Sequence, residues 1–524
     1  MKQKLVLKIL IGILTLVVLS LFLIKVVLEP WIGKQIQAEI TNSNKDFIVE
    51  IGKVHTSMWN SGLELENIAI RSKPELKDSL DLIGEIASIR VKGINLTKAI
   101  FKNDIAIREV IVLNSTIKGR IAFSDKIAKP KISPLNIRID SLFFDKTNLE
   151  IKNTLSAKTC SVKDGVLKVY DLNINKLDTI SVGLFNHFSF DVQELLAVST
   201  DSMYTYTATG INYAATSNTL TVDSFSICPN YSDYEFTARH ELETDCIRVG
   251  FGHISAHNFS VEGYLKSGDL VSSYIEIGNV NLSAFRDKRK KDQHITKPPF
   301  QEMIYNYPGS LRVDSIGIIK GNIVYTEHAE KANEPGKISF QEIHAKIYNL
   351  TNDTIYKTKE AFFKVKVEAL LMGKGKLTVL LKNRIFNKLN TFSIDGTLSG
   401  MEVKELNPML ERNAFIFATS GKIDAMDFSL TANNTKATGK MNLRYHGLNI
   451  AVKNKRTDDT TAIKERFISI IANRKILNSN PLPGEAVRIG IIDLERDPER
   501  FLFNYSFKSI LTGIKSSLVK GSKK

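Results

Sequence analysis

Short runs of alternating apolar and polar residues, broken by Asn, Gly, Asp and Ser, fill most of the chain from residue 47 onward. A period of two places successive side chains on opposite faces of an extended strand. Clear examples are IASIRVKGINL at 86–96, YIEIGNVNLSAF at 274–285 and GKMNLRYHGLNIAV at 439–452. Helical segments do not alternate with these runs, so a sheet of parallel strand-helix-strand units is not expected. We predict a mainly β protein with an extended, curved antiparallel sheet.

Two segments of similar sequence lie 174 positions apart. RIDSLFFDKTNLEI at 138–151 and RVDSIGIIKGNIVY at 312–325 share Arg, Asp-Ser, Lys and Asn at the same offsets. Asp and Ser bond local backbone and favour turns, so each copy is predicted to be a strand-turn-strand unit, and its Asp is not assigned to a catalytic carboxylate pair. Duplication of such a unit lengthens a sheet. If the sheet forms an apolar groove, its candidate lining residues are Leu142, Phe144, Leu149, Ile151, Ile316, Ile318, Ile323 and Tyr325.

An apolar segment stands at the N-terminus, where 16 uncharged residues lie between Lys8 and Lys25. With the apolar residues that follow, the segment is long enough to cross about 30 Å of hydrocarbon. No small-residue cleavage site follows it, which disfavours a cleaved signal peptide. Lys2 and Lys4 precede it and favour a cytoplasmic N-terminus. We predict that residues 1–30 form a single-pass transmembrane anchor.

The rest of the chain is expected to form four regions. A first β-rich repeat region covers 31–285, a basic loop or linker 286–300, a second β-rich repeat region 301–455, and a C-terminal region with helices 456–524. The last region contains helical spacing at 461–476 and, after Asp497-Pro498, in a final basic helix.

The final helix is predicted to be amphipathic. An apolar stripe with lysines off it is typical of a helix that contacts a membrane or fills an apolar groove, and a packed terminal helix with a soluble basic face is the alternative. The residues of this stripe are Phe503, Phe507, Ile510, Leu511, Ile514 and Leu518.

The net charge of +15 does not by itself indicate nucleic-acid binding. The excess lysine and arginine is concentrated near both ends of the chain and in RDKRKK at 286–291, and no base-stacking motif or zinc-finger spacing accompanies it. The 286–291 cluster is predicted to lie in a solvated loop, with contact to anionic lipid as the alternative. We therefore expect no nucleic-acid partner.

Motifs of enzyme chemistry are missing from the sequence. It contains no G-x-S-x-G elbow, P-loop, dinucleotide-binding fingerprint or H-E-x-x-H. HELETDC at 240–246 gathers metal-ligating residue types, but a polar hairpin turn is favoured over a metal site. Cys160, Cys228 and Cys246 allow at most one disulfide, for which Cys228 and Cys246 are the better pair, with two buried thiols as the favoured alternative. We predict a nonenzymatic protein with no catalytic site, no cofactor and no metal site.

Several segments resemble the AsmA-like family of Gram-negative envelope proteins. They are VVLEPWIGKQIQAEI and VEIGKVHTSMWNSGLELENIAI near the N-terminus, LSAFRDKRKK, SIGIIKGNIVYTEHAEKANEPGKISFQEIHAKIYNLTND and TGKMNLRYHGLNI farther along, and RDPERFLFNYSFKSILTGIKSSL near the C-terminus. Members of that family have one inner-membrane helix and a repetitive, β-rich periplasmic region related to β-groove lipid-transport proteins. No catalytic residues are known for the family, so none are assigned here.

The resemblance implies a location and a role. The N-terminus would be cytoplasmic, the anchor would lie in the inner membrane, and the bulk of the chain would be periplasmic. The implied role is cell-envelope or outer-membrane biogenesis, with phospholipid acyl chains bound or moved along an apolar groove (lipid transport). The alternative is a nonenzymatic scaffold that binds envelope proteins during their targeting to, or insertion into, the outer membrane.

Overall fold

The computed structural model describes residues 34, 46–57, 62–94, 104–122, 136–154, 158–174, 187–357, 362–452 and 475–519. The predicted anchor at 1–30 and most of the predicted helix at 461–476 lie outside these residues. Within the described part of the chain, no helix combines the length and hydropathy needed to cross a bilayer. The chain divides into two compact units, Met1–Thr216 and Ser217–Lys524, which are described separately.

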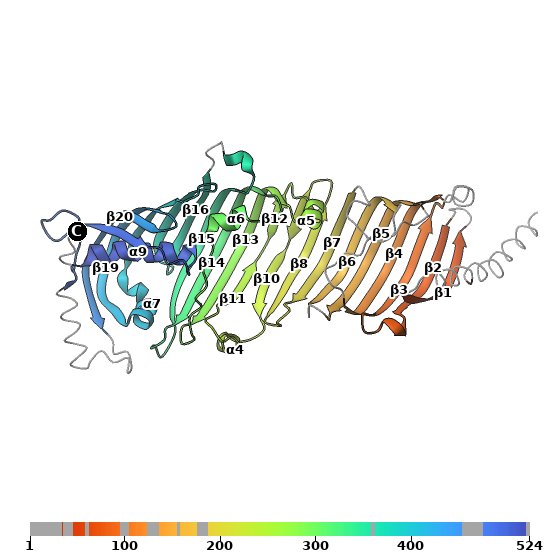
Figure 1. The fold of residues 1–524 in the computed structure, drawn as a ribbon, viewed down its shortest axis with the longest axis horizontal. Coiled ribbons are helices and arrows are strands. Elements are labelled where there is room, and N and C mark those ends of the chain that lie inside the picture. Colours follow the sequence, from red (N-terminus) through yellow and green to blue (C-terminus); the bar gives the residue numbers. More distant parts are fainter. Residues whose placement is uncertain are drawn as a thin grey trace, which may run out of the picture. The chain divides into compact units, whose positions relative to one another are not determined.

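Strands dominate both units, as the alternating pattern predicts (Figure 1). In the first unit each strand pairs with the next one along the chain. Its strands are β1 (Phe47–Ser57), β2 (Gly62–Ser72), β3 (Leu80–Lys92), β4 (Asp104–Ile121), β5 (Asn136–Asn153), β6 (Thr159–Ile174), β7 (His187–Val198) and β8 (Tyr204–Ala214).

The second unit starts with short strands and continues with long ones that again pair in chain order from β13 to β21. The short strands are β9 (Thr219–Val222), β10 (Ser224–Pro229), β11 (Cys246–Phe251) and β12 (Ile254–His257). The long strands are β13 (Leu270–Asp287), β14 (Leu311–His328), β15 (Gly336–Thr351), β16 (Phe362–Leu371), β17 (Gly375–Arg384), β18 (Phe392–Glu402), β19 (Ile416–Ala432), β20 (Lys436–Val452) and β21 (Ile489–Glu495).

Helices are short in the described residues, except for the last one. The helical elements are η2 (Pro74–Leu76) in the first unit, and α4 (Asp233–Ala238), α5 (Val261–Ser267), α6 (Phe300–Tyr305), η4 (Thr354–Lys357), η5 (Val403–Leu406), α7 (Asn407–Met409), η6 (Leu410–Ala414) and α9 (Leu502–Leu518) in the second. The prediction of a final helix after Asp497-Pro498 is thus confirmed by α9.

The expectation of a purely antiparallel sheet is wrong, because each unit contains one parallel pair. β4 pairs in parallel with β5, and β13 with β14. Parallel neighbours need a long connection that returns the chain to the same end of the sheet. Between β13 and β14, residues 288–310 make this return and carry α6.

The repeated sequence does not form a strand-turn-strand unit. Asp140-Ser141 lies inside the 18-residue strand β5, and Asp314-Ser315 lies inside the 18-residue strand β14. Farther along the same strands, Lys146 and Lys320 adopt left-handed conformations, with φ of 50° and 59°. The pairing register shifts around each lysine, which is the signature of a β-bulge and not of a turn.

The duplication extends to the strands on either side of the repeat. β4, β5 and β6 are matched by β13, β14 and β15 in length, in pairing direction and in the position of the register shifts. Left-handed residues recur near the middle of each strand of the two sets: Asn114, Lys146 and Asp164 in the first, and Asn279, Lys320 and Glu342 in the second. The β-sheet repeat is therefore a three-strand unit in which each strand has an irregularity near its middle.

Candidate functional site: the apolar face of the sheet

One face of the first unit is apolar from edge to edge. Directly opposed residues of neighbouring strands lie on the same face, so the register identifies which side chains form a row across the sheet. One row crosses β1 to β8 through Val54, Leu65, Ile89, Val112, Phe144, Leu167, Phe190 and Tyr213. A second row, beyond the bulges, runs through Val49, Ile70, Gly84, Ile117, Leu149, Val162, Leu195 and Ala208. Neither row contains a charged residue.

The bulges keep these rows on a common face. In β2, Leu65 and Ile68 are both buried, whereas Asn67 and Ala69 are exposed. Strict alternation would place residues 65 and 68 on opposite faces. The left-handed conformation of Asn67 advances the alternation by one residue, so the apolar face continues across the irregularity.

The second unit carries two similar rows. One begins at Val222 and Ile254 and continues through Ile277, Ile318, Ala345, Val367, Val379, Gly396, Phe428, Met441 and Gly490. The other runs through Ala256, Ile275, Ile316, Ile347, Val365, Leu381, Ile394, Leu430, Gly439 and Ile492. Each is again free of charged residues.

Most of the residues proposed as groove lining belong to these faces. Phe144, Leu149, Ile316 and Ile318 are members of the rows, and the register places Leu142, Ile151 and Ile323 on the same faces; all seven are half-buried. No helix of the first unit's described residues is longer than the three residues of η2. Within that described part, the apolar face is therefore not covered by a packed helix.

Tyr325 differs from the other candidates because it lies beside a polar cluster. Its hydroxyl donates to Glu327 at 2.7 Å, and burial raises its pKa. The Glu327 carboxylate also lies 3.0 Å from Lys288 Nζ and accepts a hydrogen bond from Asn413 at 2.6 Å. Tyr325 thus marks the polar end of the apolar face in the second unit.

The HELETDC segment also belongs to this polar end. The Asp245 carboxylate forms two bonds with the Arg286 guanidinium, at 2.7 and 2.6 Å. Among the residues that the structure describes, no group of three or more His, Cys, Asp or Glu side chains is arranged to hold a metal ion. Cys246 is fully buried and Cys228 is exposed, and the two thiols are free.

The C-terminal helix α9 packs on the apolar face of the second unit. The side of α9 that is buried consists of Tyr505, Ser509, Gly513 and Ser517. Leu502, Ile510, Ile514 and Leu518 are partly buried against the cluster that includes Phe392, Met441 and Ile492. The helix therefore closes one end of this face, over strands β20 and β21 (Figure 1).

The expected apolar stripe of α9 faces the sheet only in part, because Ile510, Ile514 and Leu518 pack against the cluster whereas Phe503 does not. Phe503 is 69% exposed, and Phe507 stacks on it with ring centroids 6.5 Å apart. Small residues occupy the contact because helix and strand approach closely: a Cβ on Gly513 would lie 2.8 Å from Ile492 Cγ1. In the sequence, the buried side of α9 could have been recognised from the small residues Ser509, Gly513 and Ser517, which are spaced four apart and so lie on one side of a helix.

Hydroxyl groups of α9 also cover the edge of β21. The backbone N–H of Ile491 donates to Ser516 Oγ at 3.1 Å, and that of Asp493 donates to Thr512 Oγ1 at 3.2 Å. These two N–H groups face away from β20, where another strand could otherwise pair. α9 therefore blocks extension of the sheet at this edge.

The basic segment 286–300 holds the start of α9 in place. Arg500 bonds to Asp292, His294 Nδ1 lies 3.1 Å from the Glu499 carboxylate, and the Lys297 N–H donates to the Pro498 carbonyl at 2.8 Å. These contacts tie the segment, much of which is an exposed loop, to the second unit.

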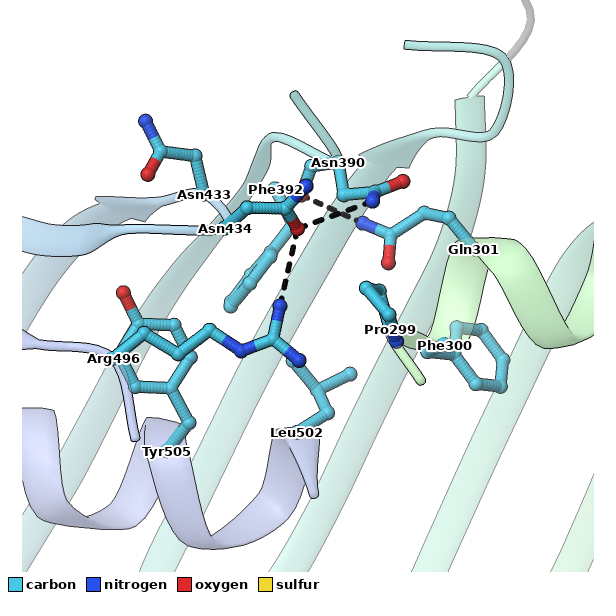
Figure 2. Close-up of a pocket in the computed structure, with 10 residues that line it drawn as sticks. All are labelled: Pro299, Phe300, Gln301, Asn390, Phe392, Asn433, Asn434, Arg496, Leu502 and Tyr505. Atoms are coloured by element: carbon cyan, nitrogen blue, oxygen red, sulfur yellow. Dashed lines mark hydrogen bonds between the residues drawn. The ribbon is translucent and has the colours of Figure 1, made fainter. Parts of the chain in front are cut away.

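A small pocket lies where this segment meets α9 (Figure 2). Arg496 and Asn390 both donate to the side-chain oxygen of Asn434 at 3.1 Å, and Gln301 donates to the Asn390 carbonyl at 2.8 Å. The cavity volume is about 10 Å³, which is room for roughly one water molecule. This pocket is too small for a substrate, so the apolar face remains the candidate site.

The chain was also compared with known proteins. No protein-family model matches it, and no curated protein matches it. The resemblance to the AsmA-like family therefore depends on the sequence segments quoted above.

Proposed function

We propose that this protein is a nonenzymatic, inner-membrane-anchored envelope protein of the AsmA-like type whose apolar face binds phospholipid acyl chains. The observation that carries the proposal is the pair of uncharged rows that crosses every strand of the first unit without a covering helix among the described residues. A large apolar surface that lacks a covering element is unfavourable in water unless a ligand or partner covers it. Acyl chains match such a surface because they need neither hydrogen bonds nor charges from it.

Adjacent residues on opposite faces allow a matched test by photo-crosslinking in cells. Phe144 lies on the apolar face, whereas its neighbour Phe143 lies on the other face beneath the Lys168 ammonium. A photoreactive phenylalanine at position 144 should yield phospholipid adducts, and the same group at position 143 should not. Equal lipid yields at both positions, or no lipid at position 144, would contradict the proposal.

The alternative is a scaffold that binds proteins during outer-membrane insertion. It rests on the same apolar face, which no helix among the first unit's described residues covers and which can also receive an apolar segment of a protein. The crosslinking experiment separates the two functions, because a scaffold predicts protein adducts and no lipid at position 144. Ile318 and Ile319, which lie on opposite faces of β14, provide the same comparison in the second unit.

A further inference from the structure

An exposed apolar rim lies at one end of the strands in the second unit. The parallel pairing of Leu270 with Leu311 places the starts of β13 and β14 at the same end. α5 and α6 precede these strands, η4 follows β15, and the turn at 385–391 joins β17 to β18, so all four segments lie at this end (Figure 1). Their exposed apolar side chains, here called the rim, are Tyr264, Leu265, Met303, Tyr305, Ile355 and Leu389.

Direct contacts join the segments of the rim. The Tyr307 hydroxyl, next to α6, donates to the Gly268 carbonyl at the end of α5 at 2.8 Å. Tyr305 meets Phe386 of the 385–391 turn edge to face, with ring centroids 6.2 Å apart. The Asn352 side chain, just before η4, donates to the Gly309 carbonyl at 2.9 Å. The rim is therefore one built surface and not a set of independent loop tips.

The apolar side chains of the rim are strongly exposed to water. Leu265 and Leu389 are each 62% exposed, and Ile355 is 60% exposed. Single exposed apolar residues are common, but a contiguous group of this kind marks a surface that binds a membrane or another molecule.

The rim is also continuous with the apolar face. Ile304 of α6 is buried in a cluster with Leu311, Val313, Phe363 and Ile385. Ile316, Ile347 and Val365 of the second unit's rows pack against this same cluster. Met303 and Tyr305, on either side of Ile304, face outward. Short helix α6 thus joins the proposed acyl-chain surface to the rim.

Lysines flank the apolar side chains of the rim, and Glu262 and Glu302 lie in helices α5 and α6. Lys266 and Lys388 are exposed next to Leu265 and Leu389. The Glu302 carboxylate of α6 is engaged by Asn390 at 3.0 Å. Apolar and tyrosine side chains flanked by lysines are the composition of surfaces that insert into the headgroup region of a bilayer.

We propose that the rim docks on a phospholipid bilayer. This contact would bring the end of the apolar face to the membrane surface, where acyl chains could enter. That consequence rests on the proposed function, whereas the docking itself does not. A protein partner at the rim is a separate outcome of the test below.

The test uses the full chain reconstituted in vesicles of phosphatidylethanolamine and phosphatidylglycerol. A C160S/C228S background removes the two exposed thiols, and Cys246 stays buried. Single cysteines at Leu265, Met303 or Leu389 receive an environment-sensitive dye. Ile319→Cys is the matched control, because Ile319 is 47% exposed in the middle of β14, away from the rim.

Dyes at the rim should shift their emission to shorter wavelength, be quenched by nitroxide lipids and resist quenching by aqueous iodide. The dye at residue 319 should show none of this. Rim dyes that behave like the control would overturn the proposal. Rim dyes shielded from both quenchers would also overturn it, because they would indicate contact with a second copy of the chain, the only protein in the vesicles. If position 144 crosslinks lipid while the rim dyes stay in water, the acyl-chain function stands and only the docking fails.

Discussion

The side-chain oxygen of Asn148 accepts a hydrogen bond from the backbone N–H of Asp164 on the next strand, at 3.1 Å. Asn322 makes the same contact with Glu342 at 3.4 Å in the second copy of the repeat. Asp164 and Glu342 both have left-handed backbones, so each asparagine satisfies an N–H group that the bulge removes from the strand ladder. The repeated asparagine therefore caps the bulge, in the sense that its side chain replaces the missing backbone partner of the bulge N–H.

Loss of this cap should destabilise the first unit. Asn148→Ala leaves the Asp164 N–H without its partner, and we expect the free energy of unfolding to fall by about 1 kcal/mol. Urea denaturation followed by circular dichroism measures the change. Glu150→Ala is the control, because its ion pair with Lys118 is exposed at the surface and should contribute only a few tenths of a kcal/mol. Equal effects of the two variants would contradict the role of Asn148.

The same residues show where prediction from sequence succeeds and fails. The period of two correctly indicates strands on both sides of Asp140-Ser141 and Asp314-Ser315. The turn expected there is wrong, because Asp, Ser and Asn are used in β-bulges for the same reason as in turns: they bond nearby backbone and tolerate left-handed conformations. Ser141 and Ser315 donate to backbone carbonyls of the parallel neighbour, at 3.2 and 3.4 Å, and only the three-dimensional structure reveals that neighbour.

The final helix shows a second limit. Helical spacing correctly predicts α9, and Ile510, Ile514 and Leu518 of the predicted apolar stripe pack against the sheet. The fully buried side of the helix, however, contains the small residues Ser509, Gly513 and Ser517, which the apolar stripe does not include. Periodicity reports hydrophobicity, whereas the distance between two backbones depends on side-chain size at the crossing point. That distance is a tertiary property that a single element does not encode.

The close crossing of α9 and β21 predicts that Gly490→Val will release the helix. A Cβ at residue 490 would lie 2.4 Å from the Gly513 carbonyl oxygen, a backbone atom that cannot rotate away. We expect the free energy of unfolding to fall by about 1–3 kcal/mol and proteolysis within α9 to become faster. Gly250→Ala in β11 is the matched control, because no atom lies within 4 Å of the added Cβ. Slow proteolysis of α9 in Gly490→Val would show that the helix can shift without leaving.

Asp287 predicts a loss of stability in acid. Its hydrogen bonds with the Arg289 side chain hold the pKa of this buried carboxyl below its usual range. An aspartate in the unfolded chain has a pKa of about 3.9, so Asp287 adds stability above about pH 4, and this contribution is lost as the pH falls through the lower folded-state pKa.

Two variants test the sign of that effect. Asp287→Asn should lower the free energy of unfolding at neutral pH and flatten its decline below about pH 4. Arg289→Gln keeps the carboxyl but removes its partner, so the folded-state pKa rises toward the unfolded value and the decline below about pH 4 should become smaller than in the parent protein. Urea titrations across this pH range provide the measurement. An acid decline that is the same in all three proteins would exclude Asp287 as its source.

The three cysteines should differ sharply in reactivity. Cys246 is completely buried at the start of β11, and burial raises its pKa to about 11. At pH 8 only about one Cys246 thiol in a thousand would therefore be the reactive thiolate, even before access is considered. Cys228 and Cys160 are exposed, although partial burial also raises the pKa of Cys160.

Iodoacetamide should modify Cys228 and Cys160 in the folded protein and reach Cys246 only in denaturant, as read by peptide mass spectrometry. If denatured, unreduced protein instead yields only one reactive thiol and a peptide pair linked through Cys228 and Cys246, the free-thiol state of the structure is wrong for the native compartment.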